Sequence, residues 1–326
     1  MNSAATWSGA RRSGLLGGLY GWMDAMPHPS MACEIAAAHV AVAAWTGGRL
    51  GLDGFAVEPL AAGTISVSPV EPNVVHAEGV RAALERALNK VHARGKEVAL
   101  LLPDQVVRVF ILHFDTFPKR ADEAEPLLRW RLKKSVPFDV EEATVSYMTQ
   151  PAQGGGVDVV AGIARRKIVR QYEEIVEAAG LTPGVVLGST LATLPLLDGE
   201  RPTLLARVTS RTLTTVITRG ELLCVYRCTE LPAEAAALEP AALLEEIYPG
   251  MAFYQDNWKE TVQQIRLAGL GGRTEEFRRA LETEINCSVA ALVASSAVEN
   301  RLSGDAKTLV DQQLDALVGW MLNRGA

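Results

Sequence analysis

The spacing of apolar and polar positions along the chain predicts alternating strands and helices. Residues 33–44 alternate as an apolar strand, and a glycine-rich turn joins them to a second apolar segment at 55–57. Apolar positions in 77–94 recur at helical spacing, and Gly95 supplies the stop. The continuous apolar run at 97–103 is typical of a central strand covered on both faces. This order predicts the beginning of an α/β domain.

The pattern changes between residues 104 and 180. Two apolar strand patterns flank a helix at 121–135, and a third strand and a further helix follow. The order strand, helix, strand, strand, helix predicts a compact α+β unit lodged inside a larger α/β fold. Its loosest turn contains the glycines at 154–156.

A second half of the chain begins near residue 181. A short helix at 189–197 precedes a meander of strands in 203–228, and a helical region follows at 239–259. A strand, a helix and a last helix at 306–323 complete this half. Both halves share the order strand, hairpin, strand, helix, strand, which indicates a weak internal duplication. Duplicated α/β halves usually bind ligands in the cleft between them.

Composition narrows the classes of function. The chain has 326 residues, a net charge of −6 and a pI near 5.5, so it lacks the basic surface that nucleic-acid binding requires. The four cysteines lie in apolar runs without metal-ligand spacing, which favours reduced thiols over a disulfide or a zinc site. No apolar run reaches the length of a membrane-spanning helix.

Residues 1–30 form an N-terminal arm with mixed signals. Arg11 and Arg12 precede a short apolar stretch that faintly resembles a signal peptide, but glycines and Asp24 interrupt it. One interpretation is an arm that contacts a membrane surface or a partner, and the other is a disordered tail. The contacting residues in the first case are Leu15, Leu16, Leu19, Tyr20 and Trp22.

Residues 97–190 carry an ordered series of short motifs. An apolar strand ends in proline, and an aromatic-proline step and a helix with tryptophan follow. A Pro-Phe step with two acids then leads to a strand that contains tyrosine. The positions are Leu102-Pro103, Phe117-Pro118, Arg129-Trp130, Pro137-Phe138, Glu141-Glu142 and Tyr147. This series resembles the PilM family, the actin-like proteins of type IV pilus assembly that are related to the division protein FtsA.

The resemblance implies an α/β, actin-like (ribonuclease-H-like) fold of two lobes with an inserted small α+β subdomain. The expected first lobe comprises residues 31–103 and 181–200, and residues 104–180 form the insert. Residues 201–326 form the second lobe with its C-terminal helix.

The resemblance also implies a cytoplasmic scaffold, peripheral at the inner membrane, that binds the cytoplasmic N-terminal segment of a PilN-like protein. Pilus motor ATPases are further implied partners, as is a second copy of the chain. The peptide groove is expected between the first lobe and the insert. Its candidate residues, each of which could equally be core, are Leu102, Pro103, Val107, Val109, Trp130 and Phe138.

Actin-like proteins hold ATP and a divalent metal such as Mg²⁺ through two phosphate hairpins. Each hairpin uses a carboxylate for the metal and a glycine that lets backbone N–H groups approach phosphate. The first hairpin here reads Glu34, Ile35, Ala36, Ala37, where the family has Asp, apolar, Gly, Ser. The second reads Arg207, Val208, Thr209 in place of Asp, apolar, Gly. Both hairpins therefore lack the glycine, and the second has lost its acid.

These departures predict a vestigial nucleotide cleft. A cation at Arg207 would repel a metal, and one hypothesis pairs it with Glu34. His39 could replace the lost hydroxyl, although a core histidine is the simpler interpretation. A glycine-rich turn with Gly269, Gly271 and Gly272 precedes a helix that Thr274 could cap; the same glycines also suit a tight connection without ligand.

No catalytic residue, metal site or cofactor is therefore expected, and ATP and Mg²⁺ enter only through the resemblance. The alternatives are an actin-like ATP-binding protein or slow ATPase, and a component resembling the cytoplasmic domain of a type II secretion platform. The remaining histidines are isolated, and no nucleophile elbow of the form G-x-S-x-G occurs.

Overall fold

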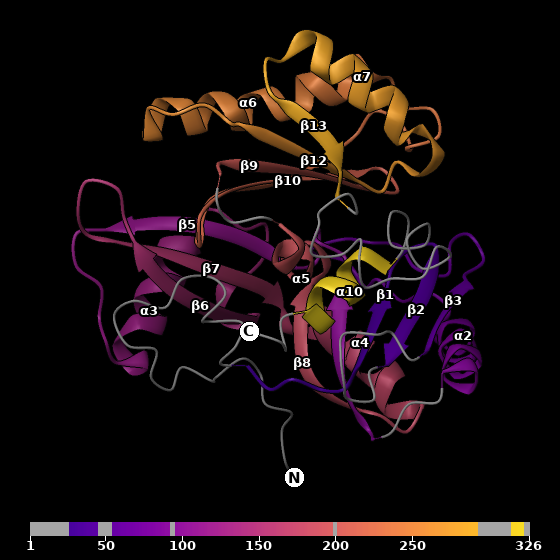
Figure 1. Cartoon of the computed structure of the whole chain (residues 1–326). Helices are drawn as coiled ribbons and strands as arrows, with labels where there is room; N and C mark the ends of the chain where they lie inside the picture. Colours follow the sequence, from indigo (N-terminus) through magenta and orange to yellow (C-terminus); the bar gives the residue numbers. More distant parts are fainter. Residues whose placement is uncertain (1–25, 45–53, 92–94, 198–200, 293–313, 323–326) are drawn as a thin grey trace. The chain divides into compact units, whose positions relative to one another are not determined.

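The computed structural model describes residues 26–44, 54–91, 95–197, 201–292 and 314–322. The chain divides into two compact units, which are drawn in Figure 1. The first unit comprises Met1–Ala192 and Asn323–Ala326, and the second comprises Thr193–Leu322. Most of the predicted arm 1–30 lies outside the described residues, as do residues 92–94 of the predicted helix 77–94 and the first part of the predicted helix 306–323.

The first unit is built on a five-stranded sheet with the order β3-β2-β1-β4-β8. The three N-terminal strands pair antiparallel, whereas β4 pairs parallel with β1 and β8. Their bounds are β1 Met31–Ile35, β2 His39–Ala44, β3 Gly54–Pro59, β4 Glu97–Leu102 and β8 Thr182–Gly188.

Two helices and the sheet form the core of the first unit. Helix α2 (Ala77–Lys90) buries a stripe that includes Val80 and Leu84, and α4 (Arg166–Ala178) buries Tyr172 and Val176. This apolar spacing is the helical periodicity that predicted both helices. A short helix, α5 (Ser189–Thr193), follows β8.

The predicted single strand 33–44 is wrong, because the chain turns back within it. Strands β1 and β2 form a hairpin in which the Ala36 N–H donates to the carbonyl of His39 at 3.0 Å. The strand β8 was not predicted as a strand at all. Its sequence TPGVVLG contains proline and glycine, which weaken the strand signal, and pairing with β4 overrides that weak propensity.

The segment between β4 and β8 contains a separate antiparallel sheet with the order β5-β7-β6, here called the inserted sheet. Helix α3 packs against β6, and Leu128 and Leu132 of α3 share an apolar cluster with Ala161 and Ile163 of β7. The bounds are β5 Arg108–Phe114, α3 Ala121–Leu132, η1 Val140–Glu142, β6 Ala143–Pro151 and β7 Val157–Arg165.

The second unit repeats the topology of the first. Its sheet has the order β11-β10-β9-β12-β13, again with three antiparallel strands followed by two parallel ones. The predicted internal duplication is therefore confirmed at the level of strand order. The bounds are β9 Thr203–Thr209, β10 Thr212–Arg219, β11 Leu222–Glu230, β12 Gln264–Ala268 and β13 Ser288–Ala291.

Helices α6 and α7 pack together, and α6 contacts strands β10 and β11 of the second sheet. The core residues on these helices include Ile247, Tyr254 and Phe277. The helical bounds in this unit are η2 Leu194–Leu196, α6 Pro240–Trp258, η3 Gly271–Arg273, α7 Thr274–Glu284 and α10 Asp315–Leu322. Within the described ranges, no helix is long and apolar enough to cross a membrane.

Candidate functional site

The turn of the first hairpin is made of ordinary backbone. Ala36 and Ala37 are half-buried, and neither has a positive φ, so the turn forms without a glycine. These alanines hold the positions that the sequence analysis assigned, through the resemblance, to a phosphate hairpin. Because the conformation does not demand glycine, alanine is retained without strain.

Glu34 lies on β1 just before this turn and is 2% exposed. Its Oε2 atom lies 3.9 Å from Nε2 of His39, so a protonated His39 would form a charge pair with it. Burial, together with the neighbouring Glu34 carboxylate, raises the pKa of the Cys33 thiol well above its usual range. Strand β1 therefore buries its side chains on both faces, whereas the turn that follows it is only half-buried.

Arg207 of the second hairpin forms a buried ion pair with Asp315, the first residue of helix α10. Its Nε atom lies 2.6 Å from Oδ2 of Asp315, and its Nη2 atom lies 3.0 Å from Oδ1. Each residue is 3% exposed. The guanidinium thus makes a two-point contact with the carboxylate in the geometry that Arg favours. Thr209, the last predicted residue of this hairpin, is half-buried at the end of β9.

The sequence pattern predicted Glu34 as the partner of Arg207 and did not single out Asp315. A signal was present, because Asp315 lies in the apolar run LDALVGWML. A carboxylate on the buried face of a helix needs a partner, since burying it unpaired costs free energy of folding.

The glycine-rich turn before α7 has internal reasons for its glycines. Gly269 has φ +78°, and a Cβ there would lie 1.8 Å from the carbonyl oxygen of Val208. Gly271 has φ 54°, whereas Gly272 has open space around it. Close packing against β9 and backbone conformation therefore account for the first two glycines without a ligand.

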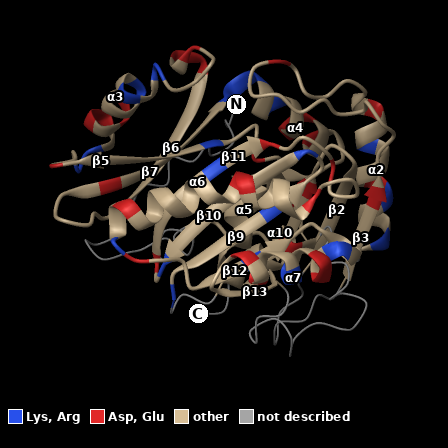
Figure 2. Cartoon of the chain, turned by 90° about the horizontal axis from the view of Figure 1, so that it is seen from above, with Lys and Arg blue, Asp and Glu red and all other residues tan. Residues whose placement is uncertain are grey.

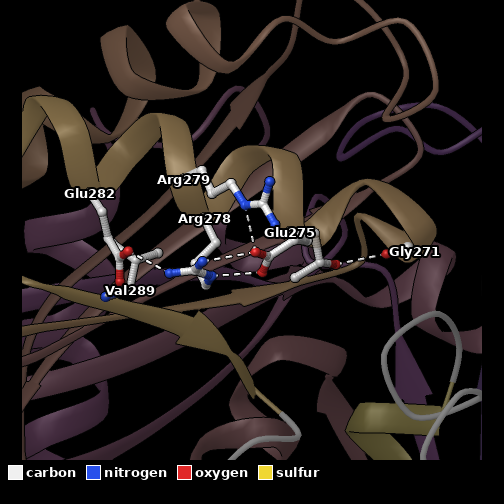
Figure 3. A network of polar contacts seen from close by, with 7 residues as sticks. Gly271, Glu275, Arg278, Arg279, Glu282 and Val289 are labelled. Carbon is white, nitrogen blue, oxygen red and sulfur yellow. Dashed lines mark hydrogen bonds and ion pairs between the residues drawn. The ribbon is translucent and has the colours of Figure 1, made fainter.

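The predicted cap Thr274 is instead the first residue of α7, and Arg273 holds the N-cap position. The hydroxyl of Thr274 donates to the carbonyl of Gly271 at 2.8 Å (Figure 3). The helix begins after a 3₁₀ turn, so no side chain is needed at the cap position to start it.

Charged side chains of α7 itself occupy the first turn of the helix. Arg278 and Arg279 both donate to Glu275, and their hydrogen bonds lower the pKa of Glu275 to about 2 (Figure 3). Arg273 pairs in the same way with Glu276. Two carboxylates, each paired with arginine, thus occupy the helix N-terminus, which is the place that favours anions.

The six predicted groove residues do not form one surface. Leu102 is fully buried, and Val107 and Val109 are less than a tenth exposed. Pro103 is half-buried at the end of β4, and Phe138 is half-buried against the apolar cluster of the inserted sheet. Only the sixth residue, Trp130, is broadly exposed.

Trp130 is 71% exposed on α3 and borders a hollow of about 470 Å³. Its neighbour Arg129 points inward, where it pairs with Glu125 at 2.7 Å and donates to the carbonyls of Val140 and Ala143. These contacts fix α3 to the start of β6. The hollow is lined by Ala121, Asp122, Glu125, Pro126, Arg129, Trp130, Lys133, Val140 and Glu141.

A set of buried hydrogen bonds within the first unit was not predicted. Asp104 follows β4 and accepts a hydrogen bond from the N–H of Thr190 at 2.9 Å and another from the Thr190 hydroxyl. The hydroxyl of Ser189 donates to the carbonyl of Leu102 at 2.9 Å. These bonds satisfy a backbone N–H group at the start of α5. They also connect the segment that follows β4 to the helix that follows β8.

Two duplicated sheets, each with three antiparallel and two parallel strands, and an inserted α+β element define this chain as a protein with an actin-like fold. The family model "Type IV pilus assembly protein PilM" matches residues 33–190. The chain is similar to the PilM family over these residues, just under half of its length, as its motifs predicted.

Solved structures agree on the fold. A chain of the "PilM-PilN type IV pilus biogenesis complex" is 19% identical, with a TM-score of 0.71, and the match covers 91% of this chain and 99% of that one. The cytoplasmic domain of EpsL, an inner-membrane component of the type II secretion system of Vibrio cholerae, is 12% identical with a TM-score of 0.51, covering 90% of this chain and 93% of that domain. At these identities the likeness concerns fold alone.

Proposed function

We propose that this chain is a cytoplasmic, non-enzymatic scaffold of a type IV pilus machine, held at the inner membrane by a PilN-like protein whose cytoplasmic N-terminal segment it binds. The match of residues 33–190 to the PilM family model carries the proposal, and likeness to a chain from a PilM-PilN complex supports it. Contacts with motor ATPases and with a second copy of the chain stay predictions.

The exposed Trp130 is the best-supported anchor for a bound peptide. A tryptophan exposed to 71% beside a hollow offers the large apolar contact on which binding energy concentrates at interfaces. The predicted groove residues Val107 and Val109 have little free surface and would support the backbone from beneath. Helix α3 is held rigidly by Arg129, so the tryptophan is presented on a fixed element.

The cleft supports a function without ATP hydrolysis. In the first hairpin Ala36 and Ala37 replace the expected glycine and hydroxyl residue, and in the second the cation Arg207 replaces the expected acid. Asp315 neutralises that cation from within the same unit, so the site has its own internal counter-ion. The alternative of an ATP-binding protein would need a phosphate and a metal to displace these contacts.

Isothermal titration calorimetry with the cytoplasmic N-terminal peptide of the neighbouring PilN-like protein tests the scaffold. We expect micromolar binding, and Trp130→Ala should weaken it about tenfold or more, as loss of an interface anchor does. The matched control Tyr248→Ala removes an aromatic side chain that is 64% exposed in the other unit and should bind normally. No binding by the unaltered chain at micromolar peptide would refute the proposal.

A second titration with ATP and Mg²⁺ tests the vestigial cleft separately. We expect no metal-dependent binding. Tight, Mg²⁺-dependent binding would overturn the vestigial cleft and leave the peptide-binding proposal standing.

A further inference from the structure

The outer face of α6 carries a patch of exposed apolar side chains. The opposite face buries Leu243, Ile247, Gly250 and Tyr254 against the second unit. On the outer face Tyr248 is 64% exposed and Phe253 is 54% exposed. Among the described residues, the other large apolar side chains exposed to this degree are Val75 and Trp130.

Tyr248 and Phe253 lie at the two edges of the outward-facing arc of α6, about 140° apart around the helix axis. This arc is here called the α6 patch. Tyr248 and Ala252 are four residues apart, as are Pro249 and Phe253, so the two pairs lie side by side along the helix. Pro249 is exposed and Ala252 is half-buried. An exposed patch of aromatic and aliphatic groups on one helix face is the signature of an interaction site.

The sequence that forms the α6 patch and the chain before it is acidic. Two arginines from neighbouring elements lie beside it, since Arg227 donates to the carbonyl of Glu246 and Arg273 donates to the carbonyl of Leu238. Between Arg227 and Lys259 the sequence contains no Lys, Arg or His, and Figure 2 shows α6 along the second unit. The acidic residues of this stretch are Glu230, Glu234, Glu239, Glu245, Glu246 and Asp256. Such a rim favours a partner with positive charge beside apolar anchors, and it disfavours an anionic membrane surface.

The chain itself contains a segment with that chemistry. Arg11 and Arg12 are followed by five large apolar residues up to Trp22, and residues 1–23 contain no Asp or Glu. This segment lies outside the described residues. Only three residues separate Trp22 from Met26, where the described first unit begins, so the chain there spans at most about 14 Å. A second copy of the chain can present this segment to the α6 patch without the constraint of that tether.

We propose that the α6 patch binds the segment Arg11–Trp22 of a second copy of this chain. The arginines pair with the acidic rim, and the leucines, Tyr20 and Trp22 cover Tyr248 and Phe253. The contact joins two different surfaces, so each copy keeps a free patch and a free segment, which permits head-to-tail assembly. This inference is independent of the peptide-binding proposal, because it involves neither Trp130 nor the inserted sheet.

Sedimentation equilibrium of the full chain tests the proposal. We expect reversible self-association at tens of micromolar, at about 0.1 M salt, weakening as salt rises. Tyr248→Ala/Phe253→Ala should raise the dissociation constant at least tenfold, and Arg11→Glu/Arg12→Glu should do the same. Both patch side chains are exposed, so melting monitored by circular dichroism should be unchanged. Val75→Ala, the matched control, removes an exposed apolar side chain of the first unit and should associate normally.

A charge swap gives the decisive result. Combining Arg11→Glu/Arg12→Glu with Glu245→Arg/Asp256→Arg should restore association to within about threefold of the original, because the opposite charges face each other again. Photo-crosslinking from Trp22→p-benzoylphenylalanine in a mixture of isotopically light and heavy chains should give mixed light–heavy products that contain α6. A monomeric chain at about 100 µM, association that the patch variants do not weaken, or crosslinks confined to single chains would overturn the proposal.

Discussion

The buried pair of Arg207 and Asp315 makes a quantitative prediction about stability. Replacing Arg207 with methionine keeps an apolar chain in place of the aliphatic stem of the arginine. It removes the guanidinium, so the Asp315 carboxylate is left buried without its two-point partner. Breaking a buried ion pair by removing one member costs about 3–5 kcal/mol, because the remaining charge is uncompensated. The simple Coulomb energy of two charges 4 Å apart, about 4 kcal/mol at an effective dielectric constant of 20, is of the same size.

The double variant separates a lost attraction from a stranded charge. In Arg207→Met/Asp315→Leu both charges are gone, so the free energy of unfolding should return to within about 1 kcal/mol of the original value or exceed it. The exposed pair Arg219–Glu260, with a similar two-point geometry at 2.8 and 3.0 Å, is the matched control. Arg219→Met should cost under about 1 kcal/mol because solvent screens that pair.

Urea unfolding followed by both far-ultraviolet circular dichroism and tryptophan fluorescence supplies the measurement. Coincident transitions are required before a single free energy is assigned, because the chain has two units. A loss below about 1 kcal/mol in Arg207→Met, or a double variant as unstable as the single one, would refute the reasoning.

Two further predictions concern the start of α7. Gly269→Ala should destabilise the second unit by about 1–3 kcal/mol, since its φ is +78° and its Cβ would strike the Val208 carbonyl, whereas Gly272→Ala, with open space, should be neutral in thermal melting. A loss equal at both glycines would contradict the packing account. The folded-state pKa of Glu275 is depressed to about 2 from 4.5, so its stabilising contribution is present above about pH 4.5 and is lost as pH falls toward 2. Glu275→Gln should therefore lower the melting temperature at pH 7 and have no effect near pH 2, with the exposed Glu284→Gln as control; a pH-independent difference would contradict it.

Much of the fold could be predicted because the helical and strand periodicities were clear in the segments that pack against a core. Helices α2, α4 and α7 follow their apolar stripes, and β4 follows its continuous apolar run. The hairpin at Ala36 to Ala38 was expected only through the resemblance, because alanines continue the apolar pattern through a turn that needs no special residue. The strand β13 was also missed, since its four residues give little periodicity to detect.

The candidate site was less accessible to sequence reasoning, because it depends on long-range contacts. The pair Arg207–Asp315 joins residues on two elements far apart in the chain, and Asp104 with Thr190 does the same. The substitutions in the hairpins were visible in the sequence, whereas their compensation required the structure. Trp130 could be named from its motif, but only its exposure distinguishes it from the buried Leu102.

The pairing of β4 with β8 has a consequence for how such proteins diversify. The two strands are direct parallel neighbours, from Glu97 beside Thr182 to Leu102 beside Gly188, although the whole inserted sheet and α4 lie between them in sequence. A parallel pair needs a long crossover in any case, so the inserted sheet extends a connection that the topology already requires. Its two ends therefore offer natural junctions at which one module could be exchanged for another, giving chimeric proteins with new binding surfaces on an unchanged sheet.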